Sequence, residues 1–151
     1  MNNLRIGALC MALAMLLAGC SKSMDINKTA DTILANITFD DEMIKAEASV
    51  IDNLYTLPTS GIEEYVIYVS ASGATANEFA IFRVKDSSAA TALTTALATR
   101  TETLKTNFEN YVPDELSRIN NKLILQKGDY VLFAVTNSNA DIQDIFNNAL
   151  S

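Results

Sequence analysis

The sequence has no histidine and no tryptophan, and its two cysteines, Cys10 and Cys20, both lie in the first twenty residues. Histidine is the side chain that most often moves protons near neutral pH, so its absence excludes Ser-His and Cys-His nucleophile pairs. Zinc sites that depend on histidine are excluded for the same reason. Carboxylates, hydroxyls, lysine and tyrosine are the groups left for chemistry.

Positive charge is also scarce. The chain of 151 residues has 11 Lys and Arg against 18 Asp and Glu, which gives a net charge of -7. Nucleic-acid binding depends on clustered Lys and Arg, so this balance argues against a nucleic-acid partner. It also gives no overall electrostatic attraction to an anionic membrane. The length and the hydrophobic content of 49% fit one compact domain.

Long hydrophobic runs are absent except near the N-terminus. Arg5 is the only charge in the first twenty residues, and residues 6–17 are all apolar or small. This run is shorter than the roughly 20 residues that a membrane-spanning helix needs. A basic head followed by a short apolar stretch is the layout of a secretory signal, so we expect residues 1–19 to be removed.

The signal ends in Leu17-Ala18-Gly19-Cys20, which resembles the bacterial lipobox. Such a motif predicts cleavage between Gly19 and Cys20 and a diacylglyceryl group on the Cys20 sulfur, which anchors the chain in the membrane. The alternative is an ordinary signal peptide with a chance cysteine. We expect a lipid-anchored protein on the extracytoplasmic face of the cell membrane, with a tether at 20–28 and one domain at 29–151. Such a mature chain has no thiol for disulfides, metal binding or catalysis.

Apolar periodicity predicts an α+β domain. Helical spacing is found at 29–37, in the second half of 43–57 after a short extended piece, at 86–112 and at 139–150, and 114–121 reads as a helical turn or a polar connection. Strands are expected at 64–71, 79–85, 122–126 and 129–136, the last two joined by a turn at Gly128. We therefore expect an antiparallel sheet of about four strands packed against helices as a two-layer domain.

The segment 70–77 between the first two strands is the candidate binding loop, with Ser70, Ser72, Gly73 and Thr75 as its candidate residues. Thr75 and Glu78 have the spacing of a capping box, which predicts a single helical turn. The loop lacks the glycines and the Lys-Ser pair of a phosphate loop. The acidic run 40–42 lacks EF-hand spacing, so we interpret it as a solvated helix end. No metal or other cofactor is expected.

Arg100 is the most unusual single residue. It occupies a gap in the apolar stripe of the long helix, between Leu97 and Leu104, so its guanidinium is predicted to point toward the sheet. An inward arginine needs a carboxylate partner, for which Glu78 is the first candidate and Glu64 the second. A structural ion pair is favoured over a ligand-binding arginine. The tyrosines Tyr65, Tyr68, Tyr111 and Tyr130 are expected at core edges rather than in a ligand cage.

Three segments carry a resemblance to a known family: residues 64–84, the helix with Arg100 that runs on to Pro113, and residues 127–135. In these segments the chain resembles domain-of-unknown-function family 4358, uncharacterised predicted lipoproteins of mostly Gram-positive bacteria. The resemblance implies a lipid-anchored envelope protein on the outer face of a single membrane. It implies no catalytic or binding residues.

These observations favour a non-enzymatic interaction module that binds another envelope component or a small ligand. The expected site is the candidate binding loop or an exposed sheet edge. One alternative is a small envelope hydrolase that uses carboxylates, either Glu63 with Glu64 or Glu78 with a neighbour. A second alternative is an accessory solute-binding lipoprotein, although the chain is short for the two-lobed clamp of such receptors.

Overall fold

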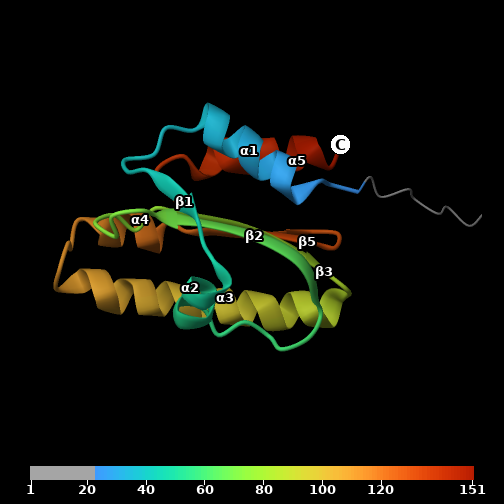
Figure 1. Cartoon of the computed structure of the whole chain (residues 1–151), viewed down its shortest axis with the longest axis horizontal. Helices are drawn as coiled ribbons and strands as arrows, with labels where there is room; N and C mark the ends of the chain where they lie inside the picture. The colour runs from blue at the N-terminus through green and yellow to red at the C-terminus, as the bar shows by residue number, and fades with distance from the viewer. Residues whose placement is uncertain (1–22) are drawn as a thin grey trace, which may run out of the picture.

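The computed structural model describes residues 23–151, so the expected signal peptide, its cleavage site and Cys20 lie outside the described residues. Five strands form one antiparallel sheet in the order β1-β2-β3-β5-β4. Figure 1 shows helices α1 and α5 on one face of this sheet and α2 and α3 on the other. The elements in chain order are α1 (Ile26–Asn36), β1 (Met43–Lys45), α2 (Ala48–Leu54), β2 (Ile62–Ser70), β3 (Glu78–Val84), α3 (Ser87–Glu109), α4 (Glu115–Asn120), β4 (Leu123–Lys127), β5 (Tyr130–Val135) and α5 (Asn139–Ala149).

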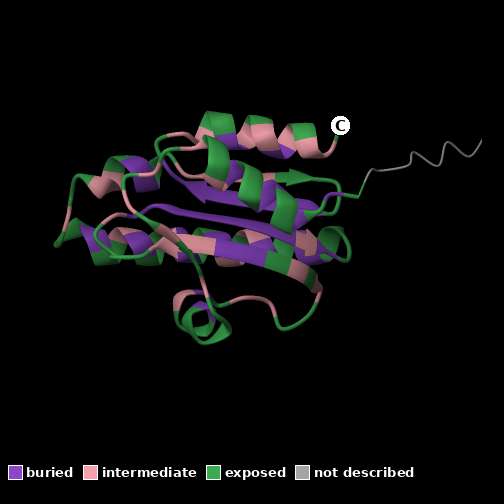
Figure 2. Ribbon diagram, turned by 45° about the horizontal axis from the view of Figure 1, so that its top comes forward, coloured by how far each residue is buried: buried purple, intermediate pink, exposed green. Residues whose placement is uncertain are grey.

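The two central strands, β3 and β5, are buried on both faces (Figure 2). Alternate residues of a strand point to opposite faces, so β3 contributes Phe82 to the core under α3, and Phe79 and Ile81 to the core under α1 and α5. Phe133 and Phe146 are fully buried, one in each core. Burial of an aromatic or aliphatic side chain contributes about 1.5–3 kcal/mol, so the two cores supply the main stabilisation.

The α+β class, the antiparallel pairing and the single domain predicted from the sequence are confirmed. The strand count and the layering differ from the prediction. The extended piece at residues 43–45 pairs with β2 as a fifth strand, Ile44 opposite Val69. Because β3 and β5 are apolar on both faces, each face needs a helical cover, and the domain has three layers rather than two.

The long helix α3 begins where its sequence signals predict and ends at Glu109, three residues before the predicted end at 112. The Asp86 side chain accepts a hydrogen bond from the Ala89 amide at 2.9 Å, which caps the helix at its first turn. The chain approaches α3 closely at Gly61, where a Cβ atom would lie 2.5 Å from the Cβ of Ala89. Gly61 has a φ of +91°, so both its conformation and its surroundings favour glycine.

The start of the domain also differs from the prediction. Residues 24–28, expected as part of the tether, belong to the folded domain, because Met24 is only 5% exposed and α1 begins at Ile26. The Met24 amide donates a hydrogen bond to the Tyr130 hydroxyl at 2.9 Å. The Asp25 side chain caps α1 by accepting from the Lys28 amide. The chain is therefore fixed to the sheet from Met24 onward.

Candidate functional site

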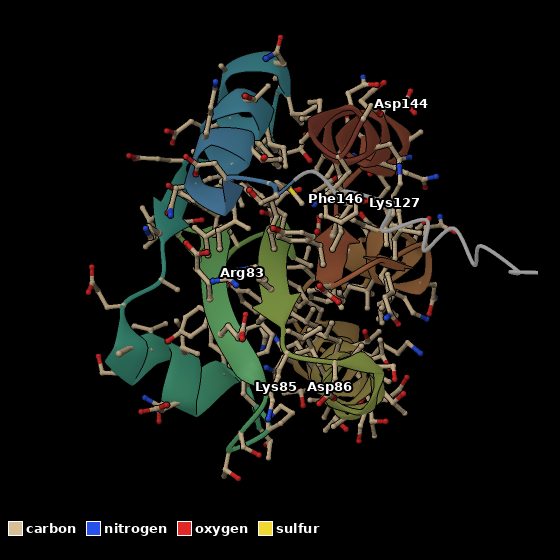
Figure 3. All side chains as sticks on the ribbon, turned by 90° about the vertical axis from the view of Figure 1, so that its right-hand side faces the viewer. Arg83, Lys85, Asp86, Lys127, Asp144 and Phe146 are labelled. Atoms are coloured by element: carbon tan, nitrogen blue, oxygen red, sulfur yellow. The ribbon has the colours of Figure 1, made fainter. Side chains whose placement is uncertain are left out.

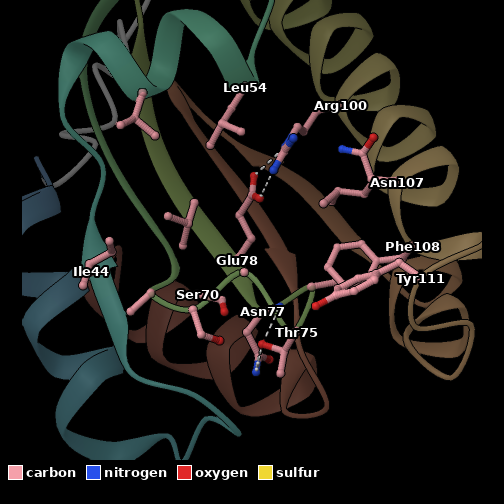
Figure 4. A pocket seen from close by; sticks show the side chains of 17 residues that line it. Ile44, Leu54, Ser70, Thr75, Asn77, Glu78, Arg100, Asn107, Phe108 and Tyr111 are labelled. Atoms are coloured by element: carbon pink, nitrogen blue, oxygen red, sulfur yellow. Dashed lines mark hydrogen bonds and ion pairs between the residues drawn. The ribbon is translucent and has the colours of Figure 1, made fainter.

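A groove of about 450 Å³ opens between β1, α2, α3 and the candidate binding loop (Figure 4). Its walls are mostly apolar side chains, and a buried ion pair lies at its inner end. The lining residues are Ile44, Val50, Leu54, Val69, Ser70, Ala71, Ser72, Gly73, Thr75, Ala76, Asn77, Glu78, Arg100, Leu104, Asn107, Phe108 and Tyr111. This volume lies within the range of small-molecule and side-chain binding pockets.

The rim of the groove is apolar and exposed. Among residues 23–151, four large hydrophobic side chains are exposed, and three of them line this groove: Ile44 at 44%, Val50 at 40% and Tyr111 at 70%. The fourth, Tyr65, lies on β2 away from the groove lining. Exposed apolar side chains gathered around one concavity are typical of a surface that binds an apolar partner.

Arg100 and Glu78, which the sequence predicts as a pair, come together at the inner end of the groove. The Arg100 Nη2 and Nε atoms donate to the two Glu78 carboxylate oxygens at 2.6 Å and 3.1 Å, a bidentate arrangement shown in Figure 4. Both residues are buried, with 6% and 2% of their surface exposed. Tyr55 completes the cluster, because its hydroxyl donates to Glu78 and its ring lies 5.3 Å from the Arg100 Cζ atom.

Burial and charge act in opposite directions on this cluster. Desolvation, and then the neighbouring negative charge of Glu78, raise the pKa of Tyr55 well above its usual value of 10.0. Burial alone lowers the pKa of Arg100, but the hydrogen bonds and charge of Glu78 reverse this, and the net pKa is raised. At neutral pH Arg100 is therefore a guanidinium and Tyr55 a neutral phenol. Their hydrogen bonds to Glu78 hold α2, β3 and α3 around the groove.

Asp41 holds the start of the candidate binding loop. Its carboxylate accepts hydrogen bonds from the Ser70 hydroxyl, from the Ser72 hydroxyl at 2.6 Å and from the Ser72 amide at 3.1 Å. These hydrogen bonds lower the pKa of Asp41 from 3.8 to about 2. The loop is thus tied to the segment before β1 by a carboxylate that is ionised at all ordinary pH values.

A second carboxylate holds the end of the same loop. Glu115 accepts a hydrogen bond from the Ala76 amide at 2.8 Å and also pairs with Arg118. Arg118 is 8% exposed and pairs with Asp40 as well. The acidic run 40–42 is therefore not a solvated helix end, because α1 ends at Asn36 and two of the three carboxylates bind the loop or its support.

The predicted helical turn in the loop is wrong. Residues 71–77 contain no helix, and Glu78 reaches Arg100 instead of folding back to the amide of Thr75, as a capping box requires. The Thr75 hydroxyl accepts a hydrogen bond from the Asn77 side chain at 3.1 Å, and Gly73 has a φ of +68°. Ser70, Ser72, Gly73 and Thr75 all line the groove.

The other carboxylates considered from the sequence lie elsewhere. Glu63 and Glu64 both pair with Arg83 on the neighbouring strand, and their side chains are 43% and 41% exposed. Glu64 is therefore not the partner of Arg100. Within residues 23–151 no group of three or more Asp, Glu, Cys or His is placed to hold a metal ion. In the same range no helix combines the length and apolar character needed to cross a bilayer.

The tyrosines do not form a cage. Tyr130 is buried, Tyr68 stacks on Phe79 at 5.1 Å, and Tyr65 lies 6.2 Å from the Phe82 ring, which are core-edge positions. Tyr111 differs, since it stands at the groove rim. A second cavity of about 460 Å³ lies between α1 and α5, and six of its nine lining residues are Ser, Asp, Lys, Thr or Asn.

Sequence reasoning missed Tyr55, Asp41 and Arg118. Each acts on a residue distant in the chain: Tyr55 bonds a carboxylate 23 positions away, Asp41 serines 29 and 31 positions away, and Arg118 a carboxylate 78 positions away. A single signal was available, because Tyr55 continues the apolar stripe of Val50, Ile51 and Leu54 and is therefore expected to face the core. Local periodicity does not place such partners.

No curated protein and no solved structure matches the chain. One family model matches, over residues 35–136, which is more than half of the chain and includes every strand and all residues of the groove. The second cavity, between α1 and α5, is formed by residues outside the matched segment. The chain therefore belongs to the family described as Domain of unknown function (DUF4358).

Proposed function

We propose that this protein is a lipid-anchored, extracytoplasmic binding module of the cell envelope, and that the groove between β1, α2, α3 and the candidate binding loop is its binding site. The observation that supports the site most strongly is the rim, where three of the four exposed large hydrophobic residues of the described chain meet. A surface of this kind in water is stabilised when a partner covers it.

The partner favoured by this shape is a protein segment that carries apolar side chains. The groove is open and bounded on one side by the backbone of a loop, with hydroxyl and amide groups at Ser70, Thr75 and Asn107 beside the apolar rim. Such a mixture suits a peptide, which offers apolar side chains together with hydrogen-bonding backbone groups. A small apolar ligand is the second candidate, because the volume of about 450 Å³ is sufficient for one.

The fixed geometry of the groove supports binding rather than catalysis. Its one buried carboxylate, Glu78, is engaged by Arg100 and Tyr55 and has no second carboxylate beside it in the lining. Asp41 and Glu115 hold the loop at its two ends. A preformed site loses less conformational entropy when its partner binds.

The binding proposal is tested by crosslinking in intact cells, followed by purification of the protein with what is attached. Tyr111→Ser removes the most exposed rim side chain, and Tyr65→Ser is the matched control, because Tyr65 is also an exposed tyrosine but lies outside the groove. We expect the attached partner to be lost from the Tyr111 variant and retained by the Tyr65 variant. Equal recovery of the partner with both variants would contradict the site.

The anchor is tested separately with Cys20→Ala. If Cys20 carries the lipid, this variant accumulates as an uncleaved precursor or leaves the membrane fraction, whereas Cys10→Ala behaves like the natural protein. Normal cleavage and unchanged membrane retention of Cys20→Ala would refute the lipid anchor. The result is independent of what the groove binds.

A further inference from the structure

We propose that the end of the domain at which α1 begins lies against the bilayer, and that the groove consequently opens away from the membrane. This inference rests on the proposed lipid anchor at Cys20. The partner of this end is the headgroup layer of the membrane that holds the lipid.

The distance between lipid and domain is the first step. Met24 is buried and joined to Tyr130 by two hydrogen bonds, its amide donating at 2.9 Å and its carbonyl accepting at 3.3 Å. Four Cα–Cα steps separate Cys20 from Met24, so the connecting chain spans at most about 14 Å. About 5–7 Å of this is needed to cross the headgroup layer, because the acyl chains lie in the hydrocarbon core. At most about 7–9 Å of the span remains between Met24 and the membrane surface, which keeps this end of the domain close to the headgroups.

Several elements meet at this end of the domain, which we term the tether end. Tyr130 is the first residue of β5 and follows the turn at 128–129, and the Asp129 carbonyl accepts a hydrogen bond from the Val84 amide at 2.8 Å. The last residue of β3 is thereby placed beside the β4–β5 turn. Figure 3 views the molecule from this side and shows Lys85 and Lys127 on it.

The groove lies at the other end of the same strands. Glu78, at its inner end, is the first residue of β3, and Val84, at the tether end, is the last. Six residue steps of about 3.3 Å place the two about 20 Å apart. In Figure 1 the start of α1 and the loop between β2 and β3 lie toward opposite ends of the long axis.

The charges at the tether end are mixed, because Lys28, Lys85 and Lys127 are exposed there beside Asp25, Asp86 and Asp129. The orientation therefore follows from the short tether and the placement of the strands, not from charge.

The test uses the purified lipidated protein in vesicles that contain phosphatidylglycerol and lipids with a nitroxide on the headgroup. Acylation of Cys20 leaves no other thiol in the mature chain, so an engineered cysteine takes a fluorescent label selectively. Lys127→Cys reports on the tether end and Tyr111→Cys on the groove; both positions are exposed. Flotation of the vesicles first establishes whether the protein is anchored.

We expect nitroxide to quench the label at position 127 several-fold more strongly than the label at position 111. Insertion of twelve Gly and Ser residues before Ser23 should reduce this difference, because the longer chain lets the domain turn. Equal quenching of the two labels in protein that floats would overturn the orientation and leave the anchor intact. Failure to float would refute the anchor, and the orientation with it.

Discussion

Arg100→Met tests whether the buried ion pair fixes the groove. The substitution keeps a long unbranched side chain but leaves the Glu78 carboxylate, which is 2% exposed, without its charged partner. Removing one member of a buried pair typically costs 3–5 kcal/mol, because the remaining charge is uncompensated. Domains of this size unfold with about 5–15 kcal/mol, so the loss is a large fraction of the total.

The assay is urea unfolding of the chain from Ser21 onward, made without the leader. With a urea dependence of about 2 kcal/mol/M, a loss of 4 kcal/mol lowers the midpoint by about 2 M. The double variant Arg100→Met with Glu78→Gln should recover much of the loss, because glutamine carries no charge and still accepts the Tyr55 hydrogen bond. A midpoint of Arg100→Met within about 0.5 M of the natural chain, about 1 kcal/mol, would refute the structural role of the pair.

Three further measurements follow from the structure. Gly61→Ala should lower the free energy of unfolding by about 2–4 kcal/mol, because the added methyl group clashes with Ala89 of α3 and the residue has an unfavourable positive φ. Gly73→Ala should lower it by only about 1 kcal/mol in the same urea assay, because nothing lies within 4 Å of the added Cβ atom. The Ser72 amide signal in NMR should titrate near pH 2 rather than near 3.8, because the amide donates its hydrogen bond to the Asp41 carboxylate. The stabilisation from this carboxylate is complete above pH 3.8 and is lost as the pH falls through about 2. Tyr55 should remain a neutral phenol at pH values above 10 for as long as the protein stays folded, because burial raises its pKa. The stabilisation that this raised pKa gives is full below pH 10 and is lost as the pH rises further. An ultraviolet titration in which all five tyrosines ionise together in the folded protein would contradict the burial of Tyr55.

Most of the secondary structure was predictable because its signals are local. The Asp86 cap and the apolar spacing after it define α3, and Gly128 with a φ of +58° defines the β4–β5 turn. The Arg100 and Glu78 pair was also predictable, because a cation inside an apolar helix stripe needs a buried acid and Glu78 starts the strand directly before α3. These are properties of single elements and of their immediate neighbours.

The layering and the support of the loop depend on packing between distant segments. β3 and β5 are apolar at every position except Glu78 and Arg83, and this pattern permitted helices on both faces, yet periodicity does not say which helix covers which face. The carboxylates of residues 40 and 41 read as solvated because charged runs usually are. Their partners come from β2, the loop after it and α4, so their role follows only from the folded arrangement.

Photocrosslinking from the groove itself decides whether the groove is the binding site. A benzophenone amino acid replaces Tyr111 in the lipidated protein, and the same group at Tyr65 serves as the control, with irradiation of intact cells. We expect one discrete crosslinked product, a protein of the cell envelope, from position 111 and none of that size from position 65. The same product from both positions, or no product from position 111 while position 65 gives one, would contradict the assignment of the groove as the binding site.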